Sequence, residues 1–184
     1  MPAHRLPSLP RPLDAFNSAS AEEAHDLLLR CLRSPRWSRR IADHRPYPDL
    51  DALLAAADEA AYDLSARDLS DALAAESLPA VPADTYAVAH TALAAAHAAY
   101  EARFGHTFVI YLGASHPDEA LDHVLEGIRS RLANDPEEER VISAEQLRYL
   151  AKERLAHLLR GTRPYPPAPA PRGAAGRVAP AHGR

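Results

Sequence analysis

The chain has 184 residues, of which 47% are hydrophobic and 25% are charged. This length and composition are ordinary for a globular protein with one core of substantial size. Seven residues are glycine, and four of these lie at or beyond position 161. Only Gly105, Gly113 and Gly127 are left for the folded part, so the sequence excludes glycine-rich phosphate loops of the Walker or dinucleotide-binding type.

The net charge of -4 hides an uneven distribution along the chain. All 25 acidic residues lie between positions 13 and 162, together with 15 of the 21 basic residues. The other basic residues lie at the two ends, and they are Arg5, Arg11, Arg163, Arg172, Arg177 and Arg184. An acidic middle is atypical of a nucleic-acid-binding domain, so we expect no nucleic-acid partner. The basic ends are typical of solvated tails, and binding of a polyanion is the alternative.

Cys31 is the only cysteine, which excludes a disulfide within the chain and favours a reducing, cytoplasmic location. Its neighbours are leucines in a helical pattern, so we expect a buried structural thiol rather than a nucleophile. No run of about 18 apolar residues is present, and the proline-rich start has no apolar signal region. The sequence therefore predicts no membrane partner.

Proline-rich segments without acidic residues occupy positions 1–12 and 163–184. Such segments cannot bury enough apolar surface to offset the entropy lost on ordering, so we predict that both are disordered. One folded domain is expected between them, over residues 13–162.

Helix-start signals recur through this domain, and each combines a capping side chain or a proline with nearby acidic residues. In chain order they are Ser20 with Glu23, Pro35, Asp49 or Asp51, Ser65 with Asp68, Pro82 with Asp84, Pro117 with Asp118, and Asp135 with Pro136. Gly105 and Gly161 follow the long middle helix and the last helix, where a left-handed residue is favoured. Thr107–Leu112 has strand-like composition but no partner strand, which predicts a buried extended connection. The fold class is therefore all-α, a single bundle of about seven to eight helices.

Ten histidines invite a metal site, but their spacing argues against one. His90 and His97, like His116 and His123, are seven positions apart, about 10 Å along a helix and too far for one ion. One helical stripe holds Tyr86, His90, Leu93, His97, Tyr100 and Phe104. The sequence leaves two interpretations of this stripe open, half-buried packing and the wall of a ligand pocket. The arginine-rich segment around Trp37 likewise fits either a solvated helix face or a phosphate site.

Three segments in fixed order carry a resemblance to a known family. They are Tyr-Glu-Ala-Arg-Phe-Gly-His-Thr-Phe-Val-Ile at 100–110, Arg-Leu-Ala-Asn-Asp at 131–135, and a glutamate-rich helix ending in Arg154-Leu155. Ser34–Trp37 and Asp71–Ala75 add weaker matches upstream. Together they resemble the 2-oxo-4-hydroxy-4-carboxy-5-ureidoimidazoline (OHCU) decarboxylase family.

The resemblance covers about residues 13–159 and implies an all-helical lyase that needs no cofactor and no metal. It implies that the ligand is a small ureido-imidazoline molecule and that OHCU is decarboxylated to (S)-allantoin in urate (purine) breakdown. It also implies a homodimer.

The resemblance also places the candidate site residues. In the family, the segment like Asp71–Ala75 leads into a His-Pro pair whose histidine is the proposed acid/base. Glu76-Ser77 stands in that place here, so Glu76 is the candidate catalytic residue. The backbone of Val109, Ile110 and Tyr111 is expected to cradle the ring.

His90 and His106 are further candidates for binding the substrate. The family's Ser-x-x-Glu-Gln loop has no counterpart, because Leu78–Asp84 runs almost directly into the long helix. An ionised Glu76 only accepts hydrogen bonds and repels a substrate carboxylate, whereas burial raises the pKa of a carboxyl group enough to keep its proton. The second hypothesis is therefore a catalytically inactive paralogue that binds a small molecule or another protein.

Overall fold

The computed structural model describes residues 12–78, 87–113 and 119–160. Their helices are α1 (Pro12–Ser18), α2 (Ala21–Leu29), α3 (Pro35–Asp43), α4 (Leu50–Tyr62), α5 (Ala66–Ala74), α6 (Ala87–Phe104), α7 (Ala120–Arg131) and α8 (Pro136–Arg160). These residues contain no strand, which confirms the all-α prediction. Helix α1 was not expected, and it begins at the last residue of the predicted N-terminal tail.

Local capping signals explain where several helices begin. The Ser20 and Ser65 side chains each accept a hydrogen bond from the backbone three residues on, and Glu23 and Asp68 complete the two capping boxes. Asp49, not Asp51, caps α4 through the backbone N–H of Ala52. The start signals expected at positions 82–84 and 117–118 lie outside the described residues.

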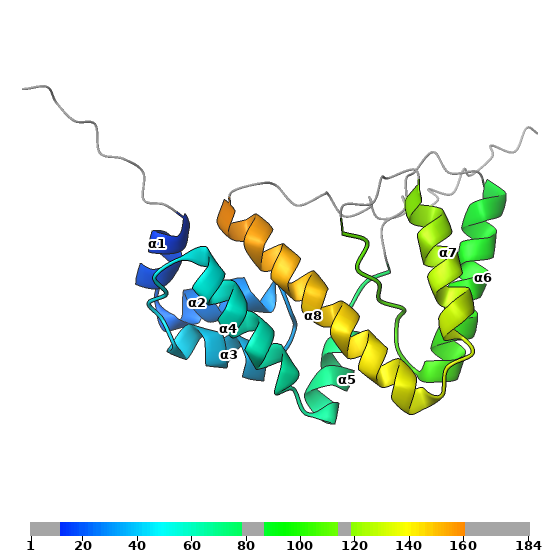
Figure 1. Ribbon diagram of the computed structural model, residues 1–184, viewed down its shortest axis with the longest axis horizontal. Helices are drawn as coiled ribbons and strands as arrows, with labels where there is room; N and C mark the ends of the chain where they lie inside the picture. Colours follow the sequence, from blue (N-terminus) through cyan, green and yellow to red (C-terminus); the bar gives the residue numbers. More distant parts are fainter. Residues whose placement is uncertain (1–11, 79–86, 114–118, 161–184) are drawn as a thin grey trace, which may run out of the picture.

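Helix α8 crosses the whole molecule and separates two groups of helices (Figure 1). On one side lie α1 to α4, which pack with α8 around the larger hydrophobic core. Trp37 is fully buried there and donates from Nε1 to the carbonyl of Ala57 at 2.9 Å. Cys31 is also buried in this core, and burial raises the pKa of its thiol to about 11. Both features confirm a structural role for Cys31.

The smaller core lies on the other side, where α6 and α7 pack together. An extended segment, residues 107–112, runs between this pair and α8 (Figure 1). Alternate side chains of an extended chain point to opposite sides. Accordingly, Phe108, Ile110 and Leu112 join the smaller core, whereas Val109 joins the larger one. This segment therefore ties the two cores together, as predicted for a buried connection.

Two glycines make this arrangement possible. Gly105 ends α6 with φ of +75° and donates to the carbonyl of Glu101, a left-handed conformation that glycine adopts without strain. Gly127 lets α7 approach the extended segment, since a Cβ at this position would lie 3.0 Å from Ile110 and 3.1 Å from Phe108. None of the helices in the described ranges is long and apolar enough to cross a membrane.

Candidate functional site

The segments that carry the family resemblance meet in a buried polar cluster at the start of α8. Arg131 donates from Nε to Oε1 of Glu139 at 2.9 Å and from Nη2 to Oγ of Ser143 at 2.9 Å. The hydroxyl of Tyr100 also donates to Oε1 of Glu139. Glu139 is completely buried, and Asn134 donates to its second oxygen at 2.9 Å. Every oxygen of this carboxylate therefore has a partner.

The pKa shifts in the cluster follow from burial and from these bonds. Burial by itself would raise the pKa of Glu139, but the hydrogen bonds and charge of Arg131, with Tyr100 and Asn134, hold it below the usual 4.5. Burial raises the pKa of Tyr100 to about 12, and its bond to Glu139 adds to the rise. The cluster thus keeps a neutral phenol beside an ionised pair.

The same cluster anchors the extended segment. Arg131 donates from Nη1 to the carbonyl of Val109 at 2.7 Å, and its guanidinium lies 4.6 Å from the ring centre of Phe108. Gln146 on α8 accepts from the backbone N–H of Tyr111 at 2.8 Å. The backbone on which the ring-binding prediction rests is therefore held in place on both sides of Ile110.

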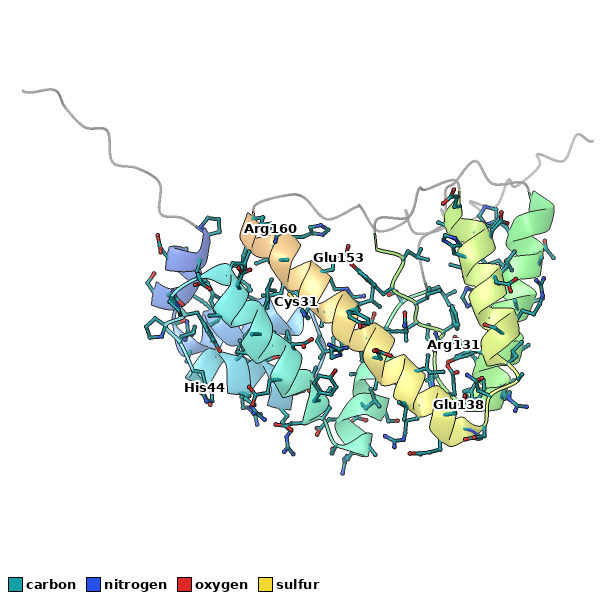
Figure 2. The ribbon with its side chains drawn as sticks, viewed as in Figure 1. Cys31, His44, Arg131, Glu138, Glu153 and Arg160 are labelled. Atoms are coloured by element: carbon teal, nitrogen blue, oxygen red, sulfur yellow. The ribbon has the colours of Figure 1, made fainter. Side chains whose placement is uncertain are left out.

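A hollow of about 300 Å³ opens where this backbone faces α8 and the chain that follows α5. We call it the candidate hollow. It is lined by residues 76–78, by Val109, Ile110, Leu112 and Gly113 of the extended segment, and by Leu150, Glu153 and Arg154 of α8. Figure 2 labels Glu153 on α8 and Arg131 of the buried cluster, which lies at the end of α7 near the start of α8.

Glu76 lies at the rim of this hollow in a bidentate pair with Arg154. Arg154 donates from Nη1 to one carboxylate oxygen at 2.8 Å and from Nη2 to the other at 2.7 Å. Nη1 also donates to the carbonyl of Cys31 at 3.0 Å. The bond to Glu76 raises the pKa of Arg154 despite its burial. In this pair the carboxylate is an acceptor on both oxygens and presents no proton to the hollow.

The other predicted residues divide between the candidate hollow and places outside it. Val109 and Ile110 line the hollow with Glu76. Tyr111 turns toward α8, where its ring stacks on Tyr149 at 5.5 Å between centres. His90 is exposed on α6, and His106 lines a separate hollow between α5 and the start of α8. Among the described residues that line the candidate hollow, none is a histidine.

The middle of the helical stripe on α6 is used for packing, whereas His90 is exposed and Tyr86 lies outside the described residues. His97 and Tyr100 are buried, and their rings pack against Phe108. Neither ring nitrogen of His97 has a hydrogen-bond partner within the described structure, and burial lowers the pKa of this imidazole below 6.5. No group of three histidine, cysteine or acidic side chains that could hold a metal ion occurs among the described residues.

Two arginines of the segment around Trp37 are used within the fold. Arg40 pairs with Asp63 and Glu59 of the α4 region. Arg45 donates to the carbonyls of Phe16 and Ala19, at 2.8 Å each. These contacts favour the structural interpretation for Arg40 and Arg45, whereas the other four arginines of the segment are exposed.

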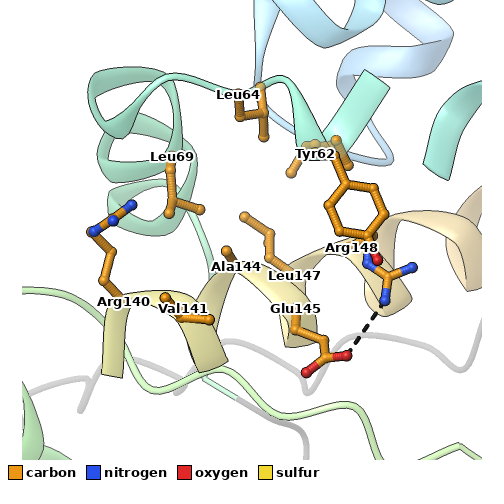
Figure 3. Close-up of a pocket in the computed structure, with 11 residues that line it drawn as sticks. Tyr62, Leu64, Leu69, Arg140, Val141, Ala144, Glu145, Leu147 and Arg148 are labelled. Atoms are coloured by element: carbon orange, nitrogen blue, oxygen red, sulfur yellow. Dashed lines mark hydrogen bonds and ion pairs between the residues drawn. The ribbon is translucent and has the colours of Figure 1, made fainter. Parts of the chain in front are cut away.

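A second hollow, of about 320 Å³, lies between α5 and the first half of α8 (Figure 3). Its walls are mostly apolar, with Leu69 facing Val141 and Leu147, and Tyr62 beside Arg148 at one end. Arg148 already pairs with Asp58 at 2.6 Å. None of the predicted site residues lies here, and no reactive groups converge, so the candidate hollow remains the better functional site.

Arg154 is the site residue that sequence reasoning missed. Its position in the motif at the end of the last helix marked the family, but its partner is 78 residues away in the chain. The motif was the available signal, because the resemblance had already singled out Arg154-Leu155.

Comparisons with known proteins agree with this architecture. A family model described as OHCU decarboxylase matches residues 17–81 and 80–156. A comparison with curated proteins found no match. The fold is similar to a crystal structure of OHCU decarboxylase in the presence of (S)-allantoin, with a TM-score of 0.64 and 19% identity over 77% of this chain and 99% of that one.

A crystal structure of (S)-allantoin synthase is also similar, with a TM-score of 0.66 and 17% identity over 81% of this chain. The match spans about half of that longer protein, 54% of its chain. At these identities the structural likeness shows the fold, while the family model covers most of the sequence. The chain therefore belongs to the OHCU decarboxylase family.

Proposed function

We propose that the candidate hollow binds OHCU and that the protein decarboxylates it to (S)-allantoin without a cofactor, as a carbon–carbon lyase of urate breakdown. Family membership and the likeness in fold to an OHCU decarboxylase support this reaction. The position of the hollow supports it too, because it lies against the backbone that the resemblance assigns to ring binding.

The observation that carries the proposal is the Arg154 guanidinium at the rim of the hollow. It already holds a carboxylate in bidentate geometry, at 2.7 and 2.8 Å, which is the geometry in which arginine recognises carboxylates in general. OHCU carries a carboxylate, and its ureido group and ring offer N–H and C=O groups to the fixed backbone beside Ile110. Arg154 and this backbone would orient the ligand together.

Decarboxylation needs little from the protein beyond orientation and a proton. The bond between the ring carbon and the carboxylate breaks, carbon dioxide leaves, and the electron pair that stays on the ring carbon takes up a proton. General acid catalysis of such a step typically contributes a factor of about 10²–10⁴. Glu76 is the titratable group of the hollow that stands where the resemblance places the family's acid/base.

A second candidate function is a ligand-binding protein without catalytic activity. The pair between Glu76 and Arg154 favours it, because the carboxylate presents no proton while both of its oxygens accept from the guanidinium. The described part of the site offers no imidazole as a substitute, since none of the described residues that line the hollow is a histidine.

Freshly generated OHCU added to the full-length protein separates the two candidates. Following circular dichroism at the allantoin signal gives both the rate and the handedness of the product. We expect faster formation of (S)-allantoin than in the spontaneous reaction, and a loss of about 10²-fold or more in Glu76→Gln. Glu126→Gln is the matched control, because this exposed glutamate of α7 pairs only with Arg129 among the ion pairs of the described residues. Ligand binding without acceleration would establish the second candidate instead.

A further inference from the structure

In the described structure, Arg154 of the candidate hollow is already paired with a carboxylate. The guanidinium that suits a ligand carboxylate is already occupied by Glu76, whose side chain is only 6% exposed. We infer that ligand binding is an ion-pair exchange, in which the carboxylate of the ligand replaces Glu76 on Arg154 and the released Glu76 takes up a proton for the reaction. This inference rests on the proposed function of the same hollow.

The exposure of the two partners shows how an exchange can occur. The side chain of Arg154 is 36% exposed although Glu76 pairs with it, so part of this side chain is open to solvent. Nη1 is also fixed by the carbonyl of Cys31 at 3.0 Å. The arginine is therefore anchored independently of Glu76, and it keeps its position when the carboxylate partner changes.

The charges that face Glu76 explain the proton uptake. In the resting state, the described residues that line the hollow carry two negative charges, on Glu76 and Glu153, and one positive charge, on Arg154. A ligand carboxylate bound without a proton would bring the total from -1 to -2 inside a partly enclosed space. Like charges at short distance favour the protonated form of one of them, so the uptake of one proton restores the original charge.

Two arginines that do not line the candidate hollow also lie near Glu76 and compete for its released carboxylate. Arg30 and Arg33 share a neighbouring hollow of about 190 Å³ with Glu76 and the buried Cys31. Both arginines are exposed, so solvent and salt screen their attraction for the released carboxylate. The ligand carboxylate on Arg154 takes the place that Glu76 held and therefore lies directly beside the released side chain. Protonation therefore prevails over re-pairing with Arg30 or Arg33.

The exchange gives a balanced reaction. The protonated Glu76 lies beside the ligand when carbon dioxide leaves, and its proton forms the new C–H bond on the ring carbon. Glu76 becomes ionised in this step. Because the product has lost its carboxylate, Arg154 is free to pair with Glu76 again, and the re-formed pair expels the product. Glu76 would thus act as proton donor and as the group that resets the site.

Calorimetric titration of the full-length protein in buffers of different ionisation enthalpy measures the protons exchanged on binding. N-carbamoylglycine is the probe, because it is a stable ureide with a carboxylate, and its amide and (S)-allantoin are the neutral controls. We expect uptake of about one proton per bound N-carbamoylglycine and none for the neutral ligands. In Glu76→Gln the uptake should vanish, and the affinity for the carboxylate probe should rise about tenfold or more, because no internal carboxylate competes for Arg154.

Two further variants serve as controls for the ion-pair exchange. Arg154→Gln should lose the preference for the carboxylate probe, and Glu126→Gln should behave as the wild type. Carboxylate binding without proton uptake would overturn the inference and show that the released Glu76 stays ionised, for example on Arg30 or Arg33. An unchanged affinity in Glu76→Gln would overturn it as well. The proposed function fails separately, if OHCU is not turned over faster although the exchange takes place. If N-carbamoylglycine does not bind although OHCU is turned over, the exchange is overturned and the proposed function stands.

Discussion

Two Arg–Glu pairs lie near the opposite ends of α8, and they differ in what surrounds them. In the pair of Arg131 and Glu139, the side chains are 9% and 0% exposed, and Tyr100, Ser143 and Asn134 use the remaining hydrogen-bonding groups. In the pair of Arg154 and Glu76, the arginine is 36% exposed and borders a hollow. The first pair is closed to any other partner, whereas the second can exchange one.

This difference separates a structural role from a functional one. Breaking a fully buried pair leaves an uncompensated charge in the interior, which is strongly destabilising. Breaking a pair at the rim of a hollow leaves a charge that water or a ligand can reach, which costs much less. Stability measurements on matched variants therefore test whether the two pairs are as different as their surroundings indicate.

The largest effect is expected from Glu139→Ala. The substitution leaves the Arg131 guanidinium beside Tyr100 and Ser143 without its carboxylate partner, and it weakens the bond from Arg131 to Val109. We expect a loss of about 3–5 kcal/mol in the free energy of unfolding, measured by urea denaturation. Glu138→Ala, at the neighbouring exposed position of α8, is the control and should change stability little. A loss as small as in this control would show that the buried pair is not what holds the cluster together.

Tyr100→Phe tests the cluster without creating an unpaired charge. The variant keeps the ring against Phe108 but removes the hydroxyl that donates to Glu139 and accepts from Arg131. Loss of one partner in a buried network should reduce the free energy of unfolding by about 1–3 kcal/mol. Tyr62→Phe, at a ring that is 70% exposed, should leave stability unchanged. Equal effects of the two substitutions would contradict the comparison.

Acid should weaken the buried pair of Arg131 and Glu139. The pKa of Glu139 is below 4.5 in the folded protein, so the stabilisation by this ionised pair is complete above that value and is lost as the pH falls through the folded pKa. The gap in unfolding free energy between the wild type and Glu139→Gln should therefore narrow from about pH 5 to about pH 3, by at most about 1.4 kcal/mol per pH unit. A gap that stays constant over this range would mean that Glu139 does not titrate there.

The smallest change in stability is expected from Glu76→Gln. The amide keeps the size of the side chain, and Arg154 retains its partial exposure and its bond to the carbonyl of Cys31. We expect a loss of no more than about 1 kcal/mol, against a much larger effect on carboxylate binding. A loss as large as that in Glu139→Ala would identify the second pair as structural and remove the basis for exchange.

Much of the fold could be predicted from the sequence because helix starts are local. Ser20, Asp49 and Ser65 satisfy backbone groups within three residues, and such signals are visible without any tertiary contact. The extended segment was likewise predicted from its composition and from the lack of a partner strand. Helix α1 was missed, because its seven residues are too few to show a clear helical periodicity.

The candidate site was harder to predict, because its geometry depends on contacts between distant segments. The sequence placed Glu76 near Val109 and Ile110 by resemblance, and the structure brings these three to one hollow. His90 and His106 were expected to help but lie outside it, since the pitch of α6 and the turn after Gly105 carry them to other surfaces.

The sequence by itself determined an all-α domain, its main helix starts and its family, because capping, periodicity and ordered motifs are read within short stretches of chain. Only the tertiary structure decided what the charged residues of the motifs do. Arg131 closes a buried cluster, and Arg154 meets Glu76 across 78 positions. The physical reason is that the partner of a charged side chain is set by how the helices pack against α8, and no local pattern encodes that packing.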